Sequence, residues 1–217
     1  PTVVDAAVRP SDTALKQIAQ TLLAAKKPVI VAGREIANAG MFAQACELAE
    51  LLGAAVYQES VPYNARYPSS HPTCMGDLTR NQKKVRQTLE QYDHLLCLGA
   101  DLLRMSPMST VEPLPPEMPV MHITEREWEL GKNYSTETAV RADVKETLLA
   151  LLPVLRAARS ADYAKAASAR VKALSANNWS AKRDKTREEF SAAAKSNPID
   201  QRYLVSQLVN VLPKDGY

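Results

Sequence analysis

Short apolar runs alternate along the chain with segments whose apolar residues recur at helical spacing. The clearest run is Pro28–Ala32, with the β-branched residues Val29, Ile30 and Val31 at its centre. A near-continuous apolar run of this length is typical of a strand that is buried on both faces of a parallel sheet. Further runs predict strands at residues 54–58, 93–99, 120–124 and 138–141.

Apolar residues at helical spacing predict helices between these strands. Ser11 or Asp12 is expected to cap the first helix, Gly53 to end the second, and Asp143 with Glu146 to form the cap of the fourth. The predicted buried stripes are Leu15, Ile18, Ala19, Leu22 and Leu23; Phe42, Ala45, Cys46 and Ala49; Val85, Leu89 and Tyr92; and Val144, Leu148, Leu151, Leu152 and Leu155.

Two long segments lack either pattern and are predicted to be loops. Residues 59–79 are rich in Pro, Ser and Tyr, and residues 100–119 carry five prolines. Loops of this length in a compact domain are usually functional or packed against a partner. The alternation of helices and strands predicts an α/β fold with an open, mostly parallel sheet. Right-handed crossovers would make it doubly wound and Rossmann-like, with three α/β/α layers.

The composition changes after Leu155. Residues 156–196 are rich in Ala, Lys and Arg, have high helical propensity, and predict a helical linker. Residues 197–217 then predict one more apolar helix. We therefore expect a domain at residues 1–155, a linker at 156–196, and at 197–217 the start of a further domain. The chain begins at Pro1 without an initiator Met, and both of its ends are interpreted as cut.

Composition narrows the function classes. The 217 residues are 46% hydrophobic and 24% charged, with a formal net charge of +3, as in an ordinary globular protein. A dense basic stripe for nucleic acid is missing from the sequence, and so is an apolar run of the ~20 residues that span a bilayer. Cys46, Cys74 and Cys97 are far apart and odd in number, which favours buried, reduced thiols and a cytoplasmic protein.

The order and spacing of five segments resemble the middle domain of thiamine-diphosphate-dependent enzymes. These segments are residues 24–33, 48–56, 67–72, 75–76 and 92–100. The tail at 198–215 is similar to the lead-in helix of that family's third, diphosphate-binding domain. Within the family, the His71-Pro72 loop and residues 99–104 are most similar to the benzoylformate decarboxylase group, followed by acetolactate synthases. Decarboxylases of this group carry a His soon after the Arg of the second loop, whereas Ser106 stands here.

The resemblance implies an enzyme acting on 2-oxo acids, in which thiamine diphosphate and magnesium lie between an N-terminal and a C-terminal domain. The Gly-Asp-Gly metal motif of the C-terminal domain does not occur in this sequence. We therefore expect no thiamine diphosphate, no metal site and no catalytic residue in this segment. Its expected role is architectural, with residues 103–109 lent to the active-site rim. The family works as dimers or tetramers, so the resemblance also implies a homo-oligomer and exposed apolar patches.

Two other hypotheses stay open. Some family members hold FAD or ADP in this domain, and the candidates for such a site here are Gly33, Gly76, Gly99, Arg104 and Thr124. The phosphate fingerprint G-x-G-x-x-G is absent, however, and bulky Arg34 and Glu35 follow Gly33. The other hypothesis is a stand-alone interaction domain, which flanking cofactor-binding domains in the coding sequence would eliminate.

The histidines and the remaining charged residues receive structural interpretations. His71, His94 and His122 lack metal-ligand spacing, and His71 is expected to hold its loop in place. Arg104 and Ser106 follow the end of a strand, where ligands of open sheets bind, but a solvated loop is the simpler interpretation. The run 125–129 is interpreted as a charged surface with one packed Trp.

Overall fold

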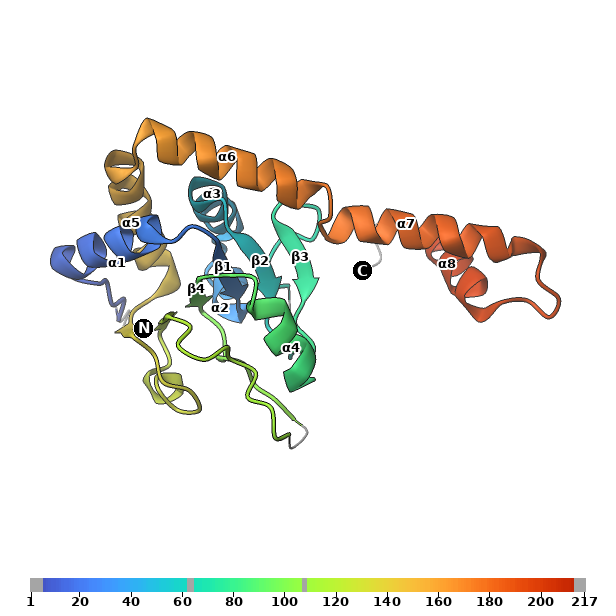
Figure 1. Cartoon of the computed structure of the whole chain (residues 1–217), viewed down its shortest axis with the longest axis horizontal. Helices are drawn as coiled ribbons and strands as arrows, with labels where there is room; N and C mark the ends of the chain where they lie inside the picture. The colour runs from blue at the N-terminus through green and yellow to red at the C-terminus, as the bar shows by residue number, and fades with distance from the viewer. Residues whose placement is uncertain (1–5, 62–64, 107–108, 213–217) are drawn as a thin grey trace, which may run out of the picture.

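A computed structural model describes residues 6–61, 65–106 and 109–212. Within these residues the chain forms one six-stranded sheet with the order β3-β2-β1-β4-β5-β6, and all neighbouring strands are parallel (Figure 1). The predicted α/β, doubly wound fold is confirmed. The strands are Pro28–Ala32 (β1), Ala55–Gln58 (β2), Cys74–Asp77 (β3), His94–Leu98 (β4), Val120–Thr124 (β5) and Thr138–Arg141 (β6).

The edge strand β3 lies inside a segment that was predicted to be a loop, so that prediction is wrong for Cys74–Asp77. The strand is short and contains Gly76 and Asp77, both of residue types that strands rarely contain. Pairing with β2, through a register shift between Val56 and Tyr57, rather than local propensity makes this segment a strand.

The predicted helices are present, together with one short helix that was not predicted, and one predicted helix ends earlier than expected. Their bounds are Asp12–Ala24 (α1), Arg34–Asn38 (α2), Phe42–Leu52 (α3), Gln82–Leu89 (α4), Val144–Ala158 (α5), Ala161–Ser175 (α6), Trp179–Ala192 (α7) and Gln201–Val211 (α8), with 3-10 turns at Glu127–Glu129 and Ala193–Lys195. The short α2 was not predicted. Tyr92, assigned to the stripe of the third predicted helix, lies beyond the end of α4.

The caps follow the sequence closely. Ser11, rather than Asp12, accepts the backbone N–H of Ala14 at the start of α1. Gly53 ends α3 with a φ of 60°. Asp143 Oδ1 accepts the N–H groups of Lys145 at 2.7 Å and Glu146 at 3.1 Å, and the backbone N–H of Asp143 donates to Val8 O rather than completing a capping box.

Side chains of alternating direction give the sheet two cores. One face packs against α1, α2, α3 and α5, and the other against α4 and the loop that follows β4. All residues of β1, β4 and β5 are buried, which explains their unbroken apolar runs. The buried strand residues on the first face are Ile30, Ala32, Val56, Cys74, Leu96, Leu98, Met121 and Ile123, and those on the second are Val29, Val31, Ala55, Tyr57, Leu95, Cys97 and Val120.

The helices beyond α5 pack against the sheet domain before they leave it. Arg170 of α6 donates to Leu52 O at 2.7 Å, and Ala167 is fully buried against α3. Asn178 donates to Pro72 O at 3.3 Å, and the ring of Trp179 covers Gly76 in β3. From there α7 and α8 extend away from the sheet (Figure 1, orange to red). The exposed apolar side chains on and beside α8 are Ile199, Leu204, Val205, Leu208, Val211 and Leu212.

A search of the described ranges for a helix with the length and hydropathy of a membrane span found none.

We predict that Gly76→Ala destabilises the protein by about 1–3 kcal/mol, because Gly76 has a φ of +99° and an added Cβ would lie 2.8 Å from Trp179 Cε3. Urea unfolding would measure the loss. Gly40→Ala is the matched control, since Gly40 has a φ of +66° but nothing within 4 Å of an added Cβ. In a double-mutant cycle with Trp179→Ala, part of the Gly76→Ala loss should be recovered. Equal losses at Gly76 and Gly40 would show that α7 does not pack on β3.

Candidate functional site

The carboxyl ends of β1, β2, β4 and β5 lie at one edge of the sheet. The order of the strands reverses between β1 and β4, and ligands of open α/β sheets bind beside such a switch point. The loops that leave these strands bring together three buried carboxylates, Glu35, Glu59 and Asp101, and the guanidinium of Arg126. This edge is therefore the candidate functional site.

Two glycines allow Glu35 to reach the centre of this edge. A Cβ on Gly33 would lie 2.0 Å from Gly99 O, so only glycine permits β1 and β4 to leave the sheet this close together. Gly99 has a φ of +62°, and a Cβ there would lie 2.6 Å from Glu35 Cβ. Glu35 is only 4% exposed as a result.

Glu35 accepts hydrogen bonds from three groups at the end of β5 and in the loop that follows it. Thr124 Oγ1 donates to Oε1 at 2.6 Å, and the backbone N–H of Glu125 donates to Oε2 at 3.1 Å. Arg126 Nε donates to Oε1 at 2.8 Å. Burying a carboxylate without donors and a counter-charge costs free energy, and here the end of β5 and the loop after it supply both.

Arg126 joins Glu35 to Asp101. Its Nη1 donates to Asp101 Oδ1, while Asp101 Oδ2 accepts Arg104 Nη1 at 3.3 Å. Burial by itself would raise the pKa of Asp101, but the hydrogen bond and charge of Arg126, with the charges of Arg34 and Arg104, outweigh it and lower the pKa. Burial likewise opposes ionisation of Arg126, and its two carboxylate partners raise its pKa overall. Both groups therefore stay charged.

Glu59 contacts the backbone rather than a cation. Its Oε1 accepts the N–H of Arg34 at 3.0 Å, and its Oε2 accepts the N–H of Asp101 at 3.1 Å. Burial raises the pKa of Glu59, and these two backbone hydrogen bonds only partly offset that effect. The carboxylate lies between the segments that follow β1 and β4. A phosphate at this switch point would compete with Glu59 for the same N–H groups and face the charges of Glu35 and Asp101.

The structure brings four of the five candidate nucleotide residues to this edge of the sheet. Gly33, Gly99 and Thr124 meet around Glu35, where they give room and a hydrogen bond to that side chain. Arg104 lies on the same edge, where its half-exposed side chain contacts Asp101. Gly76 lies apart from them, on β3 and beneath Trp179.

Sequence reasoning missed the charged residues of this edge. The run 125–129 is not simply surface, because Arg126 is largely buried and the Trp of that run, Trp128, is 68% exposed rather than packed. Lys132 Nζ lies 3.3 Å from the centre of the Trp128 ring. Their position in the sequence could have indicated them, since Glu35 and Asp101 each stand two residues after a glycine at the end of a predicted strand.

The histidines have structural surroundings. His71 Nε2 lies 3.1 Å from Glu50 Oε1, and its Nδ1 lies 3.0 Å from the hydroxyl of Tyr67 and 2.9 Å from that of Thr73, which holds the loop as predicted. Burial lowers the pKa of His94 and of His122, so both favour the neutral form. Among the described residues no group of three or more His, Cys, Asp or Glu side chains could hold a metal ion.

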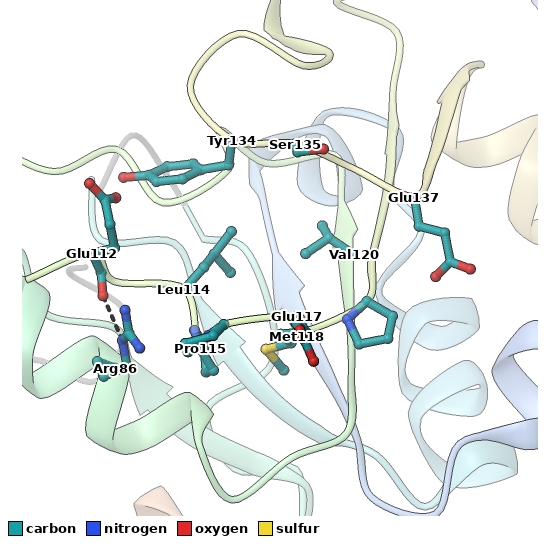
Figure 2. Close-up of a pocket in the computed structure, with 12 residues that line it drawn as sticks. Arg86, Glu112, Leu114, Pro115, Glu117, Met118, Val120, Tyr134, Ser135 and Glu137 are labelled. Atoms are coloured by element: carbon teal, nitrogen blue, oxygen red, sulfur yellow. Dashed lines mark hydrogen bonds between the residues drawn. The ribbon is translucent and has the colours of Figure 1, made fainter.

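A separate pocket of about 670 Å³ opens at the other edge of the sheet, beside Val120 at the amino end of β5. Figure 2 shows Leu114, Met118 and Tyr134 around it, with Arg86 Nε donating to Glu112 O at 2.7 Å. The loop after β4 forms one of its walls. Its place at the amino ends of the strands separates it from the carboxylate cluster.

We predict that Arg126→Met costs about 3 kcal/mol or more in urea unfolding at neutral pH, because it leaves Glu35 and Asp101 buried without their cation. Arg104→Met is the matched control and should cost less than about 1 kcal/mol, since its side chain is 56% exposed.

The stability that Asp101 contributes by pairing with Arg126 depends on pH in a direction that its pKa shift fixes. The native pKa of Asp101 is lowered, so its contribution to stability is present above the ordinary value of 3.8 and is lost as the pH falls through the native pKa. The difference in the free energy of unfolding between wild type and Arg126→Met should therefore become smaller below pH 3.8. A difference that is constant with pH would contradict the pairing of Arg126 with Asp101.

Comparison with proteins of known sequence finds relatives that are longer than this chain. A sulfoacetaldehyde acetyltransferase from Roseovarius nubinhibens is 30% identical over 186 residues, which are 77% of this chain and 30% of that protein. The large subunit of acetolactate synthase isozyme 1 from Escherichia coli is 27% identical over 166 residues, which are 75% of this chain and 29% of that protein. The chain thus spans about 30% of the length of these relatives.

Comparison with solved structures also finds similar proteins. The thiamine diphosphate-dependent 4-hydroxybenzoylformate decarboxylase of Rhodococcus jostii RHA1 superposes with a TM-score of 0.67 and 29% identity, over 73% of this chain and 30% of that one. Residues 15–151 match the family described as "Thiamine pyrophosphate enzyme, central domain", which is the family that the sequence resembles. Because this match covers more than half of the residues, the chain belongs to the thiamine pyrophosphate enzyme central-domain family.

Proposed function

We propose that this chain is the architectural middle part of a larger thiamine-diphosphate-dependent enzyme that decarboxylates a 2-oxo acid, and that it has no activity of its own. The observation that carries the proposal is the match of residues 15–151 to the central-domain family, together with relatives of which the matched residues cover only about 30%. The decarboxylase similar in structure favours lyase chemistry over transfer to a second substrate.

The site residues fit this role. The described residues offer no group of three or more metal-ligating side chains, and the sequence lacks the Gly-Asp-Gly that the family resemblance implies for the metal site. In the proposed enzyme an N-terminal and a C-terminal domain hold thiamine diphosphate and magnesium, and the cofactor supplies carbanion stabilisation there. This chain contributes the spacing between those domains and part of the active-site rim. Of the proposed rim loop at 103–109, residues 107–108 lie outside the described residues.

We further propose that residues 1–155 are the domain, 156–196 a linker, and 197–217 the start of the C-terminal domain. The exposed apolar side chains of α8 support the last assignment, because such a surface is usually covered by a partner or a neighbouring domain. A cytoplasmic homo-oligomer is the proposed assembly, and free cysteines agree with a reducing compartment.

The second candidate is an acetolactate synthase-like enzyme whose middle domain binds FAD or ADP. The E. coli acetolactate synthase subunit that is 27% identical favours the first part of this alternative. The carboxylates of Glu35, Glu59 and Asp101 at the switch point argue against the nucleotide, since they would repel its phosphates.

We predict that the full-length enzyme, supplied with thiamine diphosphate and magnesium, converts benzoylformate to an aldehyde and carbon dioxide, and that the 217-residue chain alone does not. Product analysis by chromatography would also distinguish the alternative, because a synthase would join two pyruvate molecules into acetolactate with release of one carbon dioxide. Turnover of either acid by the isolated chain would refute the proposal that its role is architectural.

We also predict that neither ADP nor FAD raises the melting temperature of the 217-residue chain, because Glu59 already accepts the N–H groups of Arg34 and Asp101. Inorganic triphosphate is the control for general anion effects. A saturable stabilisation by ADP or FAD but not by triphosphate would favour the nucleotide-binding alternative.

A further inference from the structure

The segment that follows β4, residues 101–106, has an unusual conformation. Leu103 adopts a φ of 49° although it carries a Cβ, and its side chain is buried in the second core. A residue with a side chain adopts the left-handed region only when its surroundings impose it, and such strain is concentrated in functional segments. Beyond Leu103, Arg104 and Ser106 are exposed at the carboxyl edge of the sheet.

Two consecutive residues at the exit of β2 hold this segment. Glu59 Oε2 accepts the backbone N–H of Asp101 at 3.1 Å, and Ser60 Oγ donates to Arg104 O at 3.2 Å. The other oxygen of Glu59 accepts the N–H of Arg34 at 3.0 Å, which ties the segment to the start of α2 as well. Glu59 itself is held by its backbone, because Arg66 Nη1 donates to Glu59 O at 2.6 Å.

A contribution to the stability of the fold does not explain why Glu59 is buried. It is 3% exposed, no ion pair forms to its carboxylate within the described residues, and burial raises its pKa. A buried acid without a paired cation costs free energy that an apolar residue would not. What the carboxylate provides instead is geometry, since two acceptor oxygens fix two N–H groups from different strand exits at once.

We propose that Glu59 is a positioning residue that holds the segment 101–106 in its substrate-facing conformation in the parent enzyme. That the segment faces the substrate rests on the proposed function. Glu59 touches neither Arg104 nor Ser106 through their side chains; it acts through the N–H of Asp101 and the conformation that follows from it. The position of the exposed Arg104 and Ser106 side chains is therefore set from β2.

The first experiment measures amide hydrogen exchange by NMR in the 217-residue chain. Glu59→Gln keeps the shape but presents an amide NH₂ to one of the two N–H groups, so the amide of Arg34 or that of Asp101 should exchange at least about tenfold faster. Glu59→Ala removes both acceptors and should speed the exchange of both amides. Glu125→Gln is the matched control: it removes an exposed carboxylate at the same edge and should leave both amides unchanged. Unchanged exchange in folded Glu59→Gln and Glu59→Ala proteins would overturn the proposal.

The second experiment uses the full-length enzyme. Glu59→Gln should lower kcat by about tenfold or more while the affinity for thiamine diphosphate stays unchanged, and Glu125→Gln should keep wild-type values of both. Loss of cofactor affinity in parallel with kcat would indicate general disruption and overturn a positioning role. Faster exchange with unchanged kcat would overturn the substrate-facing assignment. An enzyme that decarboxylates no 2-oxo acid would instead refute the proposed function, and the exchange experiment would still test Glu59.

Discussion

The burial of three carboxylates at one edge of a parallel sheet is the constraint around which the rest of this structure is arranged. Arg126 neutralises Glu35 and Asp101, and Glu59 relies on backbone N–H groups instead. Each of these contacts joins loops that follow different strands. These contacts tie the loops to one another and place the side chains of Glu35, Glu59 and Asp101 at the carboxyl edge of the sheet.

This arrangement changes what a common fold can do. The strand order is that of dinucleotide-binding domains, in which the switch point receives a pyrophosphate. Here Gly33 and Gly99 still allow the close approach of β1 and β4, but the space they provide is used by Glu35. A fold does not by itself carry a function, and the spacer role proposed above is compatible with a switch point that is occupied by the protein's own side chains.

The helices α6 and α7 pack on the sheet domain at defined places. Arg170 and Ala167 pack α6 along α3, and Trp179 seats the first turn of α7 on Gly76. These contacts join α6 to α3 and α7 to the edge strand β3. They also fix where α7 and α8 leave the domain, and hence where the apolar surface of α8 is presented.

Much of the fold could be predicted from the sequence, because its signals are local. The apolar runs of β1, β4 and β5 reflect burial on both faces, and the caps at Ser11, Gly53 and Asp143 depend on neighbouring residues alone. The family resemblance likewise came from ordered short segments. The strand β3 could not be predicted, since its pairing with β2 outweighs the poor strand propensity of Gly76 and Asp77.

The carboxylate cluster was decided by tertiary structure only. Glu35, Glu59, Asp101 and Arg126 are far apart in the chain, and each is an ordinary surface residue by type. They meet because parallel strands end at one edge of a sheet, so that loops distant in sequence become neighbours. By itself, the sequence determined the strands that end there and the glycines that let them approach. Which charges then pair depends on distances and burial that arise only when the sheet is assembled.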